Sequence, residues 1–302
     1  MGRPSERTRL WLPQHWPTWF GLGVFRALSL LPWPVQRGLA RGLGVFFYHV
    51  VPVRRHVTLV NLRLCFPEKS AAEIRALAKR HYQSLALGLF ETVAAWWTPP
   101  ARLPRHRLIG REHLERAIAA GKGAVVLTAH FTTLELCGRY MSEEFAMGCL
   151  YRDPNNPVLA AQMRIQRHSH MKIAVPFDDL KGLIRALRAG WAIWYAPDQG
   201  KRSKMSEILP FFGVPAITNT ATSKLAEMTG AAVVPYFAKR EADHSYTLTI
   251  LPPLENFPTA DASADAIRVN QLIEHHIREA PEQYFWVHKR FKARGPGYPE
   301  VY

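Results

Sequence analysis

The chain has 302 residues and a hydrophobic content of 48%, which excludes an intrinsically disordered protein and allows a large buried core. Its 39 Lys and Arg against 24 Asp and Glu give a formal net charge of +15. Such a balance predicts a polyanionic partner: nucleic acid, an anionic membrane, an acidic protein or a phosphorylated substrate. Three irregularly spaced cysteines argue against a disulfide framework and fit core positions in a protein of a reducing compartment: Cys65, Cys137 and Cys149.

Residues 1–60 are predicted to form an N-terminal membrane-associated helical segment. Residues 16–35 are apolar over about the length of a spanning helix, roughly 20 residues, although Arg26 interrupts them. A second apolar run covers residues 42–53. Two forms of membrane attachment remain open, a single spanning anchor or a helix pair in the membrane interface with tryptophans at headgroup level. A buried helix of a soluble protein is the third alternative.

Residues 61–302 alternate between helical and strand patterns, which predicts one α/β domain with a mixed, mainly parallel sheet flanked by helices. Apolar residues at helical spacing predict helices at residues 70–97, 112–120, 158–170, 180–189, 218–229 and 264–280. Short apolar runs predict strands at residues 107–109, 124–127, 146–151, 172–175, 191–196, 231–237 and 246–251. Ser70 and Glu73 form the sequence pattern of a capping box at the start of the first of these helices.

Two polar residues follow predicted strands closely. His130 comes after the strand at 124–127 and Asp198 after the strand at 191–196. Open α/β folds place their ligands at the carboxyl ends of strands. Glu135 follows His130 by five residues, near enough for its carboxylate to orient the ring and stabilise the imidazolium of a general base. The alternative is a partly buried histidine with a surface glutamate nearby.

Residues 129–136 resemble the His-x4-Asp/Glu box of glycerolipid-type acyltransferases, which implies a glycerolipid acyltransferase-like fold. Longer stretches resemble one branch of that group, the late acyltransferases of lipid A biosynthesis. These stretches are residues 61–68, 151–152 with 155–157, 196–199, 210–214 and 281–292, and the likeness runs from about residue 16 to the C-terminus.

This resemblance implies an enzyme of the Gram-negative inner membrane that works from the cytoplasmic face and needs no cofactor or metal. Such enzymes move a fatty acyl chain from acyl carrier protein onto the 3-hydroxyl of an acyl chain of a Kdo-bearing lipid A precursor, Kdo2-lipid IVA. Lauroyl-type first secondary acylation is expected. By the same resemblance, the catalytic residues are His130, Glu135, Arg167 and Asp198.

The predicted mechanism is direct transfer, with His130 as the general base oriented by Glu135. Arg167 or backbone N–H groups after His130 are candidates to stabilise the oxyanion. Asp198 is expected to anchor Arg167 or another basic residue, with a solvated turn residue as the alternative. The candidate substrate-binding residues are Arg152, Asn155, Asn156, Arg164, Gln199, Lys289 and Arg290. For each basic residue among them, a solvated surface position is the alternative.

Other functions remain as alternatives. One alternative keeps the same chemistry but has a lysophospholipid or another glycolipid as the acceptor. An alternative from a different functional class is a basic protein that binds membranes or nucleic acid, but the sequence has no nucleic-acid recognition motif. A zinc enzyme is disfavoured because the His-x3-His helix face is missing. The expected partners are therefore acyl carrier protein, a phosphorylated glycolipid acceptor and inner membrane lipids, without nucleic acid.

Overall fold

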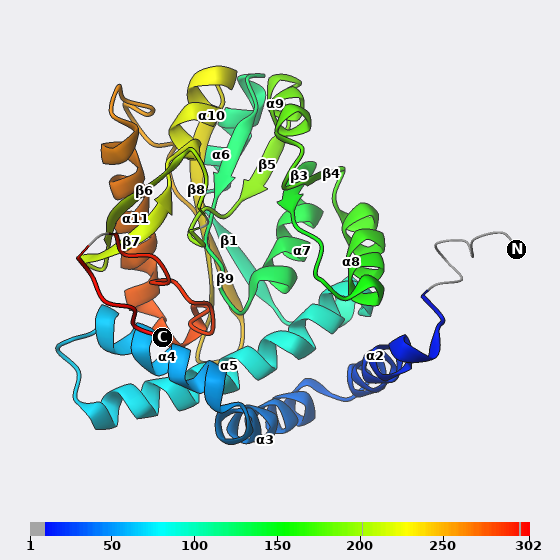
Figure 1. The fold of residues 1–302 in the computed structure, drawn as a ribbon. Coiled ribbons are helices and arrows are strands. Elements are labelled where there is room, and N and C mark those ends of the chain that lie inside the picture. The colour runs from blue at the N-terminus through cyan, green and yellow to red at the C-terminus, as the bar shows by residue number, and fades with distance from the viewer. Residues whose placement is uncertain (1–9, 201, 296) are drawn as a thin grey trace, which may run out of the picture.

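A seven-stranded sheet forms the centre of the computed structural model, which describes residues 10–200, 202–295 and 297–302 (Figure 1). The strands lie in the order β1 (His106–Ile109), β9 (Tyr246–Ile250), β8 (Ala232–Arg240), β2 (Ala124–Leu127), β5 (Ala192–Tyr195), β3 (Met147–Tyr151) and β4 (Ile173–Pro176). Only the β8–β9 pair in this sheet is antiparallel. The predicted mixed, mainly parallel sheet is confirmed.

Helices cover both faces of this sheet, and the central strand β2 shows the consequence. All four residues of β2 are buried, as expected for a strand enclosed by helices on two sides. Val125 and Leu127 belong to one hydrophobic core, together with residues of α9 (Leu180–Arg188), α10 (Ala221–Thr229) and α11 (Ala262–Glu279). Ala124 and Val126 belong to a second core with α6 (Arg111–Ala119) and α7 (Leu134–Glu144).

Helix α5 (Ala71–Trp97) runs along one end of the sheet (Figure 1). Its predicted capping box is confirmed, because the Ser70 side chain accepts from the Glu73 N–H while the Glu73 carboxylate accepts from the Ser70 N–H. Gly88 lets α5 approach the loop after β2, since a Cβ at this position would lie 2.5 Å from the Thr132 carbonyl oxygen. The helix therefore supports the loop that carries His130.

The N-terminal part forms three helices, α2 (Trp16–Leu28), α3 (Trp33–Val50) and α4 (Pro52–Cys65), after a short 3-10 turn η1 (Pro13–His15). Within the described residues, none of the helices combines the length and apolar character required to span a bilayer. Of the two alternatives for residues 16–35, a single helix of spanning length is not what the structure shows. The run is split because α2 ends at Leu28 and Pro32 caps the start of α3. Residues 1–9 of the expected segment lie outside the described residues, and its boundary at residues 60 and 61 falls inside α4.

The remaining elements are α8 (Pro157–His170), the 3-10 turns η2 (Pro100–Arg102) and η3 (Pro281–Gln283), and the antiparallel hairpin β6 (Ser206–Phe211)–β7 (Val214–Asn219). The predicted strands and most predicted helices are confirmed within a few residues. The hairpin was not expected, and residues 218–219, predicted as helical, end β7. Phe212 and Gly213 form the turn with φ values of 52° and 72°, as a two-residue hairpin turn requires. All three cysteines are free and buried, as expected.

Candidate active site

His130 follows β2 in a loop that a distant part of the chain holds in place. The Phe285 N–H donates to the His130 carbonyl oxygen at 3.0 Å, and the Thr132 N–H donates to the Gln283 carbonyl oxygen at 2.7 Å. Phe131 and Tyr284 form an antiparallel bridge between these two hydrogen bonds. The segment at 283–285 therefore pairs with the His130 loop like a short strand and fixes the backbone of the histidine.

Asp198 is the carboxylate that orients the His130 ring. The His130 Nδ1 atom lies 2.7 Å from Asp198 Oδ1, and the His130 N–H donates to Asp198 Oδ2 at 3.2 Å. The side chain of Asp198 is 0% exposed and that of His130 is 32% exposed. Because a carboxylate accepts, Nδ1 carries the proton and Nε2 is left for proton transfer.

The register of the sheet explains why these two residues meet. Strands β2 and β5 are parallel neighbours, and Leu127 pairs with Tyr195. His130 and Asp198 each follow their paired residue by three positions, so both leave the same edge of the sheet side by side. The site lies at the carboxyl ends of adjacent strands, where α/β folds place their ligands.

Tyr284 completes this hydrogen-bonded chain. Its hydroxyl donates to Asp198 Oδ2 at 2.9 Å. Burial, followed by the charge of Asp198, raises the pKa of Tyr284 well above 10, so the phenol keeps its proton and remains a donor. The Tyr284 side chain was not identified as functional, although the stretch containing it, residues 281–292, stood out in the sequence. A hydroxyl aimed at a buried carboxylate is visible only once the fold is known.

The charges of the pair act against the cost of burial. Burial alone lowers the pKa of His130, but the Asp198 charge and hydrogen bond outweigh it and hold that pKa above 6.5. Burial likewise raises the pKa of Asp198, but attraction to His130 and hydrogen bonds from His130 and Tyr284 bring it below 3.8. Asp198 is therefore ionised near neutral pH and makes His130 a stronger base.

Glu135 does not have the position expected for it. Its Oε1 atom accepts from Nη2 of Arg167 on α8 at 2.9 Å, whereas Asp198 holds His130. The expected His130–Glu135 pair is thus wrong, and of the two options for Asp198, Arg167 or another basic residue, the structure has the second, with His130 as its partner. Helix α7 begins at Leu134, so Glu135 stands in its first turn and meets α8 instead of the histidine ring. The Arg167 Nη1 atom is buried and has no hydrogen-bond partner within the described residues.

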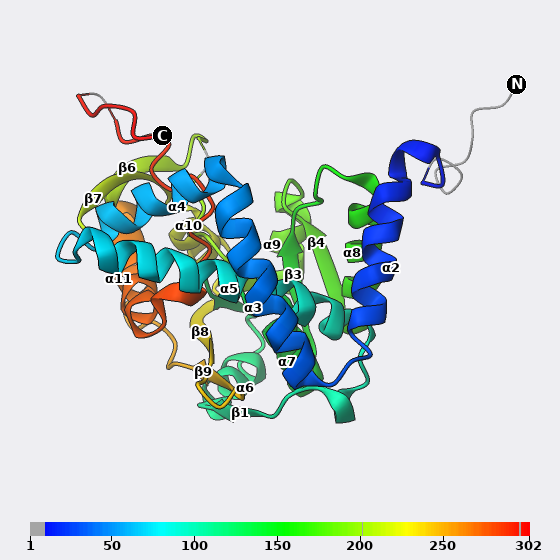
Figure 2. The ribbon, with the colours of Figure 1, turned by 90° about the horizontal axis from the view of Figure 1, so that it is seen from below.

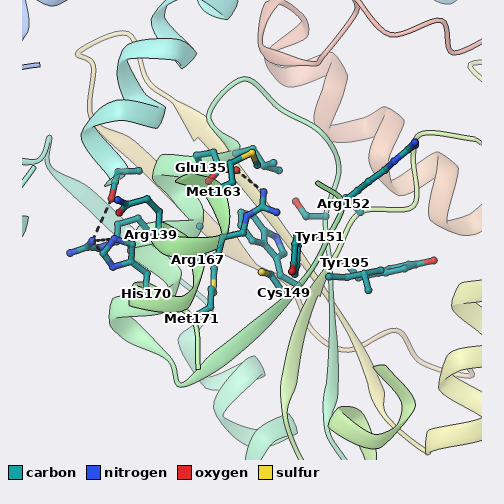
Figure 3. A pocket seen from close by; sticks show the side chains of 18 of the residues that line it. Glu135, Arg139, Cys149, Tyr151, Arg152, Met163, Arg167, His170, Met171 and Tyr195 are labelled. Atoms are coloured by element: carbon teal, nitrogen blue, oxygen red, sulfur yellow. Dashed lines mark hydrogen bonds and ion pairs between the residues drawn. The ribbon is translucent and has the colours of Figure 1, made fainter. Parts of the chain in front are cut away.

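A cavity of about 310 Å³ opens beside these groups, and His130, Glu135 and Arg167 line part of it. In Figure 3, Glu135 and Arg167 point toward each other, while Arg139 contacts His170 elsewhere in the pocket. Much of the wall is apolar and comes from Ala95, Trp96, Leu134, Gly138, Met163, Met171 and Trp194. Gly138 makes room for the Trp194 ring, since a Cβ there would lie 2.1 Å from it. The site therefore combines a base and a cation with a mainly apolar cavity.

The structure separates the candidate substrate-binding residues. Arg152 lines the cavity. Asn155 and Lys289 are exposed, Gln199 is half-buried next to Asp198, and Arg164 lies 3.6 Å from Asp153 in an exposed ion pair. These five side chains are at least partly accessible and therefore remain candidates for substrate binding.

Two of the candidate substrate-binding residues have structural roles instead. Arg290 is 2% exposed, and its guanidinium donates to the Ile217 carbonyl oxygen and the Thr218 hydroxyl. Asn156 is the N-cap of α8: its side-chain oxygen accepts from two N–H groups of that helix and its amide donates to Thr18. Arg290 is buried with both terminal nitrogens bonded to protein groups, and the Asn156 side chain is used by the cap and by Thr18, so the expectation that they bind substrate is corrected.

A histidine–carboxylate pair at the carboxyl end of a strand, beside a mainly apolar cavity, is an arrangement that suits an enzyme acting on the polar end of an apolar chain. The sequence matches the family described as bacterial lipid A biosynthesis acyltransferase over residues 3–293. It is 38% identical to the lipid A biosynthesis lauroyltransferase of Escherichia coli strain K12, over 99% of each chain. Identity to the palmitoleoyltransferase of that strain is 37%, over 96% of this chain and 95% of the other, and to its myristoyltransferase 27%, over 96% and 91%.

The chain belongs to the bacterial lipid A biosynthesis acyltransferase family, and it is an acyltransferase.

Proposed function

We propose that the protein transfers a fatty acyl chain from acyl carrier protein to the 3-hydroxyl of an acyl chain on Kdo2-lipid IVA. The observation that carries the proposal is His130, held through Nδ1 by Asp198 with Nε2 available, on the wall of a mainly apolar cavity. Identity is higher to the lauroyl- and palmitoleoyltransferases than to the myristoyltransferase, which supports a lauroyl-type first secondary acylation.

The reaction is a direct transfer. His130 Nε2 removes the proton from the acceptor hydroxyl as its oxygen attacks the thioester carbonyl carbon. The new C–O bond forms, the C–S bond breaks, and the imidazolium returns the proton to the carrier thiolate. Asp198 stabilises the imidazolium between these steps. The thioester is already activated, so no covalent acyl-enzyme and no cofactor is required.

Arg167 is the proposed donor to the oxyanion of the tetrahedral intermediate. Arg167 lines the cavity, Glu135 holds it through Nη2, and its buried Nη1 group has no hydrogen-bond partner within the described residues. Two backbone N–H groups near His130 already have acceptors, because Thr132 donates to Gln283 and Leu134 donates to Phe131. A preorganised cation in an apolar site stabilises developing negative charge more strongly than water does.

Membrane association is proposed through α2 and α3 lying in the interface of the inner membrane on its cytoplasmic face. The two helices lie along the lower side of the molecule in Figure 1, and Figure 2 shows that side from below. Large apolar side chains are exposed on them: Trp16, Phe20, Val24, Val35, Leu39, Val45, Phe46 and Val50. Together with the net charge of +15, this surface suits an anionic bilayer.

The membrane proposal is tested by sedimentation with anionic phospholipid vesicles. Phe20, which is 75% exposed, is replaced by Glu, and the matched control is Leu180→Glu on α9, where the leucine is 45% exposed. Phe20→Glu is expected to reduce vesicle binding about tenfold and Leu180→Glu to leave it unchanged. Equal binding of both variants and the wild type contradicts the interfacial role of α2.

The activity is tested with purified wild type and His130→Ala in detergent. Each protein receives acyl carrier protein loaded with a radiolabelled lauroyl chain, and either Kdo2-lipid IVA or a lysophospholipid. The wild type is expected to label Kdo2-lipid IVA only, and His130→Ala to lose this activity by at least 10²-fold. Labelling of the lysophospholipid instead identifies the alternative acceptor, and equal transfer by both proteins refutes the role of His130.

A further inference from the structure

A second cavity of about 300 Å³ lies beneath α2 and is almost entirely apolar. It is lined by Thr18, Gly21, Leu22 and Phe25 of α2, Leu89, Thr92, Val93 and Trp96 of α5, and Leu159 of α8. Both threonine hydroxyls are already engaged: Thr92 donates to the Gly88 carbonyl oxygen and Thr18 accepts from Asn156. We call this cavity the α2 groove. Its surface is suited to hydrocarbon.

Helix α2 covers the groove and is attached near its two ends. Asn156 at the start of α8 holds Thr18, and the Arg26 guanidinium donates to the Trp97 carbonyl oxygen at 3.1 Å. Phe25 packs edge-on against Phe90 of α5, with ring centroids 5.5 Å apart. Between these attachments stands Gly21, and a Cβ added there would meet nothing within 4 Å. The absence of a side chain at this glycine leaves the groove open.

Both faces of α2 are apolar. Positions 18, 21, 22 and 25 share one side of a helix and face the groove. Trp16, Phe20 and Val24 share the opposite side and are 60%, 75% and 39% exposed. A helix that is apolar all round is stable where both sides meet apolar material. The proposed membrane supplies apolar contacts for the outer face of α2. The face toward the groove needs another apolar group to contact.

The substrates of the proposed reaction provide hydrocarbon chains that could make this contact. An acyloxyacyl ester is a branched product, in which two long chains diverge from one ester group. The catalytic cavity, about 310 Å³, is matched in size by the α2 groove, about 300 Å³. Trp96 lines both. Two apolar chains that meet at one reacting centre thus have two adjacent apolar sites.

We propose that the α2 groove binds an acyl chain of the lipid acceptor while the catalytic cavity takes the chain of the donor. This inference rests on the proposed function. The acceptor is the membrane-resident substrate, and the groove lies under the helix whose outer face carries the exposed Trp16 and Phe20. Occupation of the groove therefore draws the acceptor from the bilayer side toward the base.

A matched pair of glycine substitutions on α2 tests the proposal. Gly21→Leu fills the groove, whereas Gly23→Leu adds the same side chain on the opposite side of the helix, where a Cβ also meets nothing within 4 Å. Both changes favour the helix to a similar extent. Steady-state transfer is measured over a range of Kdo2-lipid IVA concentrations and with decanoyl, lauroyl and myristoyl donors.

Gly21→Leu is expected to raise the KM for Kdo2-lipid IVA about tenfold, with kcat and the order of donor preference unchanged, and Gly23→Leu to match the wild type. A Gly21→Leu enzyme with wild-type KM overturns the proposal. A changed order of donor preference also overturns it, because the groove then holds the donor chain.

A second measurement separates this inference from the proposed function. The wild type is irradiated with a lysophospholipid whose acyl chain carries a diazirine, and the labelled peptides are identified by mass spectrometry. Labels in residues 16–28 and 89–96 that Gly21→Leu abolishes and Gly23→Leu retains support an acyl-chain site, even if Kdo2-lipid IVA is not a substrate. Equal labelling of these peptides in all three proteins, or none in the wild type, overturns the groove as an acyl-chain site.

Discussion

Replacement of Asp198 by asparagine tests which carboxylate controls His130, the proposed catalytic base. Asp198 makes two hydrogen bonds to His130 and its side chain is 0% exposed, so water does not replace the lost charge. An amide removes the negative charge that stabilises the imidazolium and permits the wrong ring tautomer. We expect kcat/KM to fall by about 10² to 10⁴-fold, which corresponds to about 3 to 5 kcal/mol in the transition state.

The pH profile carries a second signature of the same change. In the proposed mechanism His130 works as a neutral base, so kcat/KM is expected to rise as the pH increases through its pKa. In the wild type this pKa lies above 6.5 because Asp198 outweighs the effect of burial. When the carboxylate is neutralised, burial alone remains and lowers the pKa of His130. The acid limb of the Asp198→Asn profile is therefore expected below pH 6.5.

Glu135→Gln is the control for this experiment. Glu135 pairs with Arg167, so its neutralisation is expected to lower the rate through the misplaced cation while the acid limb stays where it is in the wild type. Both profiles are measured by transfer of radiolabelled lauroyl groups between pH 5 and 9. The interpretation is refuted if Glu135→Gln moves the acid limb and Asp198→Asn does not.

Three further predictions concern Tyr284 at the site and two buried groups, Arg240 and His81. Tyr284→Phe removes a donor from Asp198, leaves its charge more available to the imidazolium, and should move the acid limb of kcat/KM to higher pH without changing the rate at alkaline pH. Arg240→Met leaves the buried Glu91 carboxylate without its cation and should lower the free energy of unfolding by about 3 to 5 kcal/mol in urea, whereas Lys239→Met, at a 41% exposed side chain, should have little effect. Burial lowers the pKa of His81 from 6.5 to about 4, so the stability that this histidine contributes is present above pH 6.5 and lost as the pH falls to 4. His81→Asn, which keeps a donor toward the Glu282 carbonyl oxygen, should therefore reduce the loss of unfolding free energy between pH 7 and 4 by about 3 kcal/mol.

The sheet and most of its flanking helices were predictable because their patterns are local. Strand β2 is an apolar run with a turn signal before it, and α5 carries both helical periodicity and a capping box. Helix α4 has no comparable signal, since its buried residues include the polar Thr58 and Asn61 and no clear apolar face results. The β6–β7 hairpin includes Pro210 and Pro215, which disfavour a strand prediction, yet they pair with each other in a two-stranded ribbon that has open edges.

The partners of the site residues were harder to predict than the residues themselves. His130, Glu135, Arg167 and Asp198 all lie where the candidate site is, but short spacing favoured a pair between His130 and Glu135. The actual pair depends on β2 and β5 being neighbours, and strand order in a sheet cannot be read from spacing along the chain. Tyr284 illustrates the same limit, because it reaches Asp198 across 86 positions of sequence.

The pairing of Asp198 with His130 and of Glu135 with Arg167 also has an electrostatic reason. The Arg167 side chain is only 16% exposed, and a buried guanidinium without a carboxylate costs several kcal/mol. If Glu135 served His130, then Arg167 would lose its partner while His130 faced two negative charges. With one carboxylate for each cation, His130 remains available for its proposed role as a base, and Arg167, which lines the cavity, keeps a carboxylate partner and one N–H group that is unpaired among the described residues. A single mainly apolar cavity can then hold both groups that the proposed transfer uses, one to take the proton and one to stabilise the oxyanion.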